Sequence, residues 1–129
     1  MILTMPQIIL IVEDNENNRD LLKDILSFHG YEIAVASDGQ EGVVLARELL
    51  PDLILMDIQM PGMDGMTACS ILKGDRLTSG LKIIALTSFA MQGDREKFLA
   101  AGFDGYLPKP ISTRELPDLI KEWLQEERA

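Results

Sequence analysis

Short apolar segments alternate five times with longer segments of helical period along this chain, and no other feature limits its fold so strongly. Such alternation is typical of βα units built around a parallel sheet. The predicted strands are Ile8–Val12, Glu32–Ala36, Leu53–Met56, Lys82–Leu86 and Asp104–Leu107. The predicted helices are Asn17–His29, Gly39–Leu50, Gly65–Gly74, Met91–Ala101 and Arg114–Glu126. We therefore expect an α/β fold in which helices cover a parallel sheet.

Residues that favour helix ends support several of these limits. Gly30 and Gly102 follow predicted helices, and glycine suits the left-handed conformation in which many helices end. Asp38, with Glu41 three residues later, has the pattern of a capping box at a helix start. These signals predict the ends of three helices independently of the apolar period.

The last predicted helix combines a clear apolar face with conflicting signals at its start. Ser112 and Glu115 have the pattern of a capping box, whereas Pro117 removes a backbone donor near the first turn. The apolar residues recur at the spacing of one helical face, which is expected to pack on the core. They are Leu116, Leu119, Ile120, Trp123 and Leu124.

The length and composition indicate one globular domain. The 129 residues are 47% hydrophobic and 26% charged, which predicts a single domain over residues 1–129, with a core at about 7–127 and no output domain. No apolar run approaches the ~20 residues of a membrane span, and no basic segment precedes the first apolar run, so we expect a cytoplasmic protein without membrane insertion. The net charge of -9 argues against direct nucleic-acid binding. The single cysteine, Cys69, is expected to be a small buried hydrophobe.

Polar side chains stand at the ends of four of the five predicted strands. Because the carboxyl ends of parallel strands meet at one edge of a sheet, where ligands usually bind, we expect these side chains to converge. Each alone is more often a helix cap, a satisfied hydroxyl or a solvated charge, but their convergence favours one pocket. In chain order they are Glu13 and Asp14 after the first strand, Asp57 at the third, Thr87 and Ser88 at the fourth, and Lys109 at the fifth.

This set of residues predicts a particular chemistry. Three carboxylates held close together repel one another unless a positive group lies among them. Oxygen ligands favour Mg²⁺ or Mn²⁺ over zinc, and Mg²⁺ commonly combines one or two carboxylates with waters and a phosphate oxygen. The site is therefore expected to take a phosphoryl group. Asp57 is the candidate nucleophile, while Thr87 would donate a hydrogen bond to that group and Lys109 would pair with its charge.

Nearly the whole chain resembles the receiver domain of two-component response regulators, through the segments ILIVEDNENNRDLL, DLILMDIQMPGMDG and IIALTSFAMQGDREKFLAAGFDGYLPKPI. The resemblance implies a doubly wound, flavodoxin-like fold with a five-stranded parallel sheet of order 2-1-3-4-5. It implies a phosphorylation switch that is not an enzyme beyond Mg-dependent self-phosphorylation and self-dephosphorylation. It also implies a histidine kinase or histidine phosphotransfer protein as the phosphoryl donor, and a target protein that reads the surface of the fourth helix, fifth strand and fifth helix.

The resemblance also implies a role for each acidic residue of the site. Asp57 resembles the phospho-acceptor, and Asp14 and Asp57 resemble the side-chain ligands of Mg²⁺. Glu13 would contact the ion mostly through a water, and the backbone carbonyl of Gln59 would complete the protein ligands.

Residues after the fourth and fifth strands match further family positions. Thr87 and Lys109 match the switch hydroxyl and the phosphate-pairing lysine, and the amide of Ser88 would also reach the phosphate. Tyr106 matches the aromatic switch position, and the peptide bond Lys109–Pro110 matches one that is cis in the family. Phe89 stands where the family varies and influences the lifetime of the phosphoryl group.

Three other interpretations remain. A phosphatase of the haloacid dehalogenase type also uses an aspartate nucleophile and Mg²⁺, but it needs a second acid where this chain has Gln59. A flavodoxin-like electron carrier needs a phosphate loop rich in glycine and hydroxyl groups where this chain has the segment EDNEN. A phosphate-independent scaffold with the receiver fold is disfavoured by the intact set of polar residues.

Overall fold

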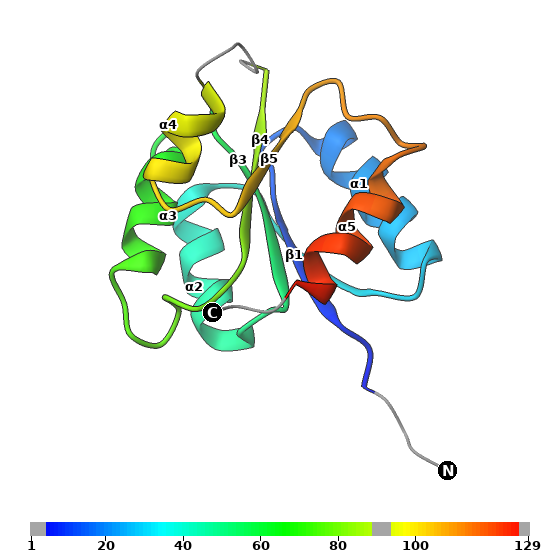
Figure 1. The fold of residues 1–129 in the computed structure, drawn as a ribbon, viewed down its shortest axis with the longest axis horizontal. Coiled ribbons are helices and arrows are strands. Elements are labelled where there is room, and N and C mark those ends of the chain that lie inside the picture. Colours follow the sequence, from blue (N-terminus) through cyan, green and yellow to red (C-terminus); the bar gives the residue numbers. More distant parts are fainter. Residues whose placement is uncertain (1–4, 89–93, 127–129) are drawn as a thin grey trace.

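The computed structural model describes residues 5–88 and 94–126, which form a parallel sheet between two layers of helices (Figure 1). The sheet order β2-β1-β3-β4-β5 confirms the predicted order. The strands are β1 (Ile8–Val12), β2 (Glu32–Ala36), β3 (Leu53–Asp57), β4 (Ile83–Thr87) and β5 (Gly105–Pro108). The helices are α1 (Glu16–Phe28), α2 (Gly39–Leu49), α3 (Gly65–Lys73), α4 (Asp94–Ala100) and α5 (Leu116–Gln125).

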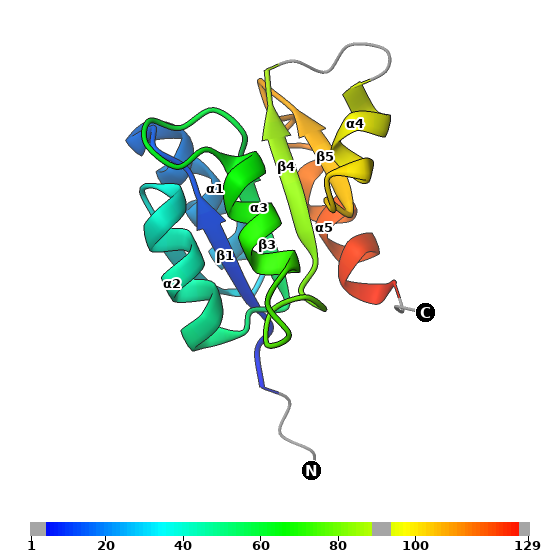
Figure 2. The same ribbon diagram turned by 90° about the vertical axis from the view of Figure 1, so that its left-hand side faces the viewer.

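The sheet separates two hydrophobic cores. Helices α2, α3 and α4 cover one face and form the first core, and α1 and α5 cover the other face and form the second (Figures 1 and 2). Successive strand residues point to opposite faces, so Leu10 and Val12 of β1 lie in the first core, and Ile9 and Ile11 lie in the second. Burial on both faces explains why the central strands are apolar throughout. Within the described residues, no helix combines the length and apolar character needed to cross a membrane.

The predicted strands are confirmed to within one residue at each end. Strand β3 extends to Asp57, which pairs with Leu86 of β4, so the carboxylate belongs to the last residue of the strand. Strand β4 runs one residue further than predicted and ends at Thr87, and β5 ends at Pro108. Pairing with a neighbouring strand therefore continues up to the polar residues.

Helix starts are less well predicted than strands. Residues 91–93 of the fourth predicted helix lie outside the described residues, and α4 is described from Asp94. Helix α5 begins at Leu116, two residues later than predicted, and its N-cap Glu115 has no side-chain capping bond. Ser112 does accept the Glu115 amide, at 3.4 Å, but in a turn before the helix, so the predicted capping box is wrong. Pro117 fits the first turn because no backbone donor is needed there.

The other predicted helix signals are confirmed. Gly30 and Gly102 adopt positive φ angles of 91° and 108°, which glycine tolerates without a Cβ clash. The Asp38 carboxylate accepts the Glu41 amide at 2.8 Å and caps α2. In α5, Leu116 and Ile120 are buried and the rest of the stripe packs around the second core.

Gly65, the first residue of α3, lies against the strand that carries Asp57. A Cβ atom at this position would be 2.2 Å from the Asp57 carbonyl oxygen and 2.9 Å from the Ile58 Cα atom. Both are backbone atoms that cannot rotate away, and the Gly65 amide donates to the Ile58 carbonyl at 3.1 Å. The absent side chain therefore lets α3 begin in contact with the end of β3.

Gly65→Ala is expected to lower stability by about 2 kcal/mol or more, or roughly 5–10 °C in Tm, because the backbone of β3 must shift. Gly80→Ala is the matched control, since nothing lies within 4 Å of a Cβ at Gly80. Thermal unfolding followed by circular dichroism measures both. Equal Tm values for the two variants would show that the close approach at Gly65 is unimportant.

Cys69 lies in α3 and is fully buried in the first core, as predicted. Burial raises the pKa of its thiol to about 11. We expect the native protein to react with a thiol reagent at neutral pH about a hundred-fold or more slowly than the protein in denaturant, because thiolate is scarce and inaccessible. Spectroscopic measurement of the two rates tests this, and similar rates would contradict the burial of Cys69.

Candidate functional site

The polar strand ends meet at one edge of the sheet, the upper edge in Figure 2. The three acidic residues and Lys109 converge there. Ligand oxygens of Glu13, Asp14 and Asp57 all lie within 4.8 Å of one another, although residues 13–52 separate β1 from β3 in the chain. Parallel pairing of β1 with β3 is what brings these carboxylates together.

Glu13 is fully buried and is held by hydrogen bonds along its length. Its amide donates to the Ala36 carbonyl at 3.0 Å, and its own carbonyl accepts Nη1 of Arg19 at 3.0 Å. Its Oε1 atom accepts the Asn15 amide at 3.3 Å. The Asn15 side chain also caps α1 by accepting the Asn18 amide at 3.0 Å. The start of α1 therefore fixes the loop that carries Glu13 and Asp14.

Asp57 is 3% exposed, and donors reach both of its carboxylate oxygens. The Gln59 amide donates to Oδ1 at 3.0 Å, and Nζ of Lys109 donates to Oδ2 at 2.9 Å. The Ile58 amide donates to the Leu86 carbonyl at 3.0 Å, which extends the β3–β4 pairing past the site. The position of this carboxylate is therefore set by the sheet rather than by a free loop.

Lys109 bridges two of the acids. Its Nζ atom lies 2.9 Å from Asp57 Oδ2 and 3.0 Å from Glu13 Oε2, and its side chain is 18% exposed. The Lys109 amide donates to the Thr87 carbonyl at 2.7 Å, and the peptide bond to Pro110 is cis, as the family resemblance implied. The sequence predicted that Lys109 would lie here but not that it would bind both acids.

Burial and charge act against each other in this cluster. Burial raises the pKa of the Glu13 carboxyl above its ordinary value, although the hydrogen bond from Lys109 opposes the rise. Burial alone would lower the pKa of the Lys109 ammonium, but the hydrogen bonds and charges of Asp57 and Glu13 outweigh it, so that pKa is raised. The lysine is therefore charged at neutral pH, and the acids strongly favour a cation near them.

The acidic cluster fits a divalent metal ion. Three carboxylates supply oxygen ligands, the donor type that Mg²⁺ and related ions prefer. Asp14 is exposed while Glu13 and Asp57 are buried, so the cluster opens to solvent on the Asp14 side. An ion could therefore enter without any change in the core.

Three of the other predicted site residues lie beside this cluster, one lies apart from it, and one lies outside the described residues. Thr87 is 1% exposed at the end of β4, and Ser88 follows it on the surface. Gln59 is exposed next to Asp57. Tyr106 lies apart from the acids, half-buried against the first core, with its ring centroid 6.2 Å from that of Phe98 in α4. Phe89 lies outside the described residues.

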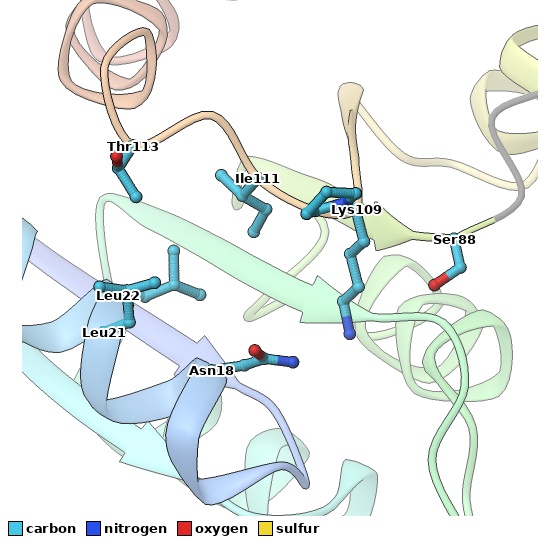
Figure 3. Close-up of a pocket in the computed structure, with 8 residues that line it drawn as sticks. Asn18, Leu21, Leu22, Ser88, Lys109, Ile111 and Thr113 are labelled. Carbon is cyan, nitrogen blue, oxygen red and sulfur yellow. The ribbon is translucent and has the colours of Figure 1, made fainter.

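A cavity of about 370 Å³ adjoins the site between α1 and the segment after β5 (Figure 3). Sequence reasoning missed it. Leu21 of α1 lines it and is 48% exposed, but the sequence alone does not show that exposure. Reasoning from sequence also missed Arg19. Its side chain binds the backbone carbonyl of Glu13, and every residue type offers such a carbonyl, so no sequence pattern marks the contact. The cavity is lined by Asn18, Leu21, Leu22, Ser88, Lys109, Pro110, Ile111 and Thr113.

Comparison with known proteins identifies the family to which this arrangement belongs. The family model described as the response regulator receiver domain matches residues 9–121. The chain is 43% identical, over 120 residues, to the polar-differentiation response regulator DivK of Brucella anthropi, covering 93% of this chain and 98% of that protein.

Solved structures that share the fold include two receiver domains. One is the receiver domain of a sensor histidine kinase from Pseudomonas aeruginosa with a magnesium ion in its active-site cleft (TM-score 0.86, 37% identity, 95% of this chain and 100% of that chain). The other is a Saccharomyces cerevisiae response regulator receiver domain co-crystallised with a histidine phosphotransfer protein (TM-score 0.85, 33% identity, 92% and 88%). The chain is therefore a member of the response regulator receiver domain family of two-component signalling.

Proposed function

We propose that this receiver domain is a phosphorylation switch that accepts a phosphoryl group on Asp57. The observation that carries the proposal is the position of the Asp57 carboxylate, buried at the end of β3 and surrounded by two acids and a lysine. Few structural reasons exist to hold three like charges so close together with two of them buried, whereas phosphoryl transfer to a carboxylate needs this combination.

Asp57 would act as the nucleophile. One of its oxygens forms a bond to phosphorus as the bond from phosphorus to the donor's imidazole nitrogen breaks, and the electron pair of that bond remains on the nitrogen. The Gln59 amide, bound to Oδ1, keeps the carboxylate in one orientation, which favours an in-line approach by Oδ2. Buried and ordered, the nucleophile requires little reorganisation before it reacts.

Glu13, Asp14 and Asp57, with the Gln59 backbone carbonyl, would hold Mg²⁺, and Mn²⁺ could replace it because it accepts the same oxygen ligands. The ion supplies positive charge that offsets the charge of the moving phosphoryl group. Thr87 and the Ser88 amide would donate hydrogen bonds to the phosphoryl oxygens, and Lys109 would pair with their charge. The same residues would support self-phosphorylation from small phosphodonors and self-dephosphorylation by water.

Phosphorylation would change the surface around α4, β5 and α5. A phosphoryl group adds about -1.5 to -2 charges, which would draw Thr87 toward the site. Tyr106 pairs with Ala85 in the β4–β5 ladder, and Thr87 lies two residues beyond Ala85, so Thr87 and Tyr106 share one face of the sheet. Inward movement of Thr87 would vacate space for the Tyr106 ring. Because that ring packs near Phe98, its movement would reach α4.

The partners follow from this chemistry. A histidine kinase or a histidine phosphotransfer protein would donate the phosphoryl group, as the pairing of a similar yeast receiver with a phosphotransfer protein suggests. A second protein would read the α4-β5-α5 surface. The net charge of -9 disfavours nucleic acid as that target. We place the protein in the cytoplasm.

Incubation with acetyl phosphate and Mg²⁺ is expected to add one phosphoryl group to the wild-type protein. Asp57→Asn should abolish the modification and keep the fold, because the amide has the same shape but is a poor nucleophile. Intact-protein mass spectrometry measures the product, and Asp52→Asn is the control, since Asp52 lies at the opposite end of β3. Full modification of the Asp57→Asn protein would refute the proposal.

Mg²⁺ is expected to raise the Tm of the unmodified protein, because binding to the folded acid cluster favours the folded state. Asp14→Ala removes one of the three acids and should reduce the rise to less than half. Asp24→Ala, which removes an exposed acid further along α1, is the charge-matched control and should respond like the wild type. An unchanged response in Asp14→Ala would place the ion elsewhere.

A further inference from the structure

We propose that the turn between β2 and α2, residues 36–39, positions the metal site, and that Gly39 is the residue on which this positioning depends. The inference rests on the proposed Mg²⁺ site and concerns how its ligands are held in place. Strand β2 is the one strand whose end carries no predicted site residue. Its turn would therefore act on the ion only through the two neighbouring loops that carry the ligands.

The 36–39 turn holds the loop after β1. The carbonyl of Ala36, a buried residue, accepts the Glu13 amide at 3.0 Å. Val12 and Ala36 are the last residue pair of β1 and β2, so this bond continues the pairing of the two strands into the loop. The positions of Glu13 and of Asp14 after it therefore depend on where Ala36 lies.

The same turn contacts the loop after β3, residues 58–64. Gly39 is buried, and a Cβ atom on it would lie 2.4 Å from the Met63 carbonyl oxygen and 3.2 Å from the Met63 carbonyl carbon. Figure 2 shows this loop passing beside the start of α2. The loop also carries the Gln59 carbonyl, a proposed ligand. The start of α2 therefore supports the backbone of a second ligand loop.

Hydrogen bonds fix both ends of the 58–64 loop. The Ile58 amide donates to the Leu86 carbonyl at 3.0 Å, and the Gly65 amide donates to the Ile58 carbonyl at 3.1 Å. A displacement of Met63 must therefore be absorbed between these ends, where Gln59 lies.

A side chain at position 39 would displace one of the two ligand loops. The Met63 atoms that it would meet include the backbone carbonyl, which cannot rotate away as a side chain can. If the 58–64 loop moves, the Gln59 carbonyl moves with it. If α2 moves instead, the turn carries Ala36 along and shifts Glu13. Mg²⁺ demands near-ideal octahedral geometry, so either shift should weaken its binding.

The test compares Mg²⁺ binding to the wild type and to Gly39→Ala by isothermal titration calorimetry, without any phosphodonor. Gly39 has no positive φ angle, so alanine adds a methyl group without a strained backbone conformation. We expect the Kd of Gly39→Ala to be about ten-fold higher than that of the wild type, an effect typical of residues that orient metal ligands. A Kd within about two-fold of the wild-type value would overturn the proposal.

Gly105→Ala is the matched control. A Cβ atom at Gly105 would lie 3.1 Å from the Trp123 ring, so the same substitution crowds a packed contact at the opposite end of β5 from Lys109. Its Tm is expected to fall because the ring must shift, while its Kd for Mg²⁺ should stay within about two-fold of the wild type. An equal rise of Kd in both variants would show a general effect of destabilisation and would likewise overturn the proposal.

A measurement on the wild type covers the case in which Gly39→Ala does not fold. Linkage is reciprocal, so an ion whose binding depends on this turn should also steady the turn. The Gly42 amide, which donates to the Asp38 carbonyl at 3.0 Å, should exchange with D₂O about three-fold or more slowly at saturating Mg²⁺. The Ser79 amide, bound to the Asp75 carbonyl at 2.8 Å near the opposite edge of the sheet, reports any general slowing. Equal slowing of both amides would refute the link.

Labelling of Asp57 by acetyl phosphate tests the proposed function separately. At saturating Mg²⁺, Gly39→Ala should still be labelled, because β3 itself holds the nucleophile. A labelled variant with the wild-type Kd would overturn the role of Gly39 alone. A wild type that binds no Mg²⁺ and takes no label would refute both proposals.

Discussion

The repulsion between two buried carboxylates dominates this end of the molecule. Glu13 and Asp57 lie at the ends of adjacent strands with almost no exposure to water, and an unpaired buried charge costs several kcal/mol. Lys109 relieves the repulsion, and its backbone is fixed in turn by the bond to Thr87. The ends of β1, β3 and β5 are thereby joined through charge as well as through the sheet, and the end of β4 is joined to them by the backbone bond between Lys109 and Thr87. Any cation or phosphoryl group that enters must rearrange this balance.

The sheet fixes the position of the Asp57 carboxylate within the site. Hydrogen bonding between β3 and β4 continues past Asp57 to Ile58, and Gly65 allows α3 to begin against the same strand end. The nucleophile is therefore held on a rigid element, whereas Asp14 and Ser88 lie on exposed loop positions beside it. Such a division suits a switch, because the reacting group stays in place while its surroundings respond.

Sequence reasoning succeeded where the physical cause is local. Strands buried on both faces need continuous apolar residues, so their limits were visible, and left-handed helix ends were visible at Gly30 and Gly102. It failed at the start of α5, because a proline in the first turn is compatible with a later helix start than the serine pattern indicated. The contact between Lys109 and Glu13 joins residues 96 positions apart and depends on side-chain rotamers, which no sequence period records.

The sheet also divides the molecule into two halves that share almost no side chains. Tyr106 and Phe98 belong to the core on the α2-α3-α4 side, whereas Leu22 and Ile111, which line the cavity beside Lys109, belong to the core on the α1-α5 side. Substitutions on one side can therefore accumulate without repacking the other.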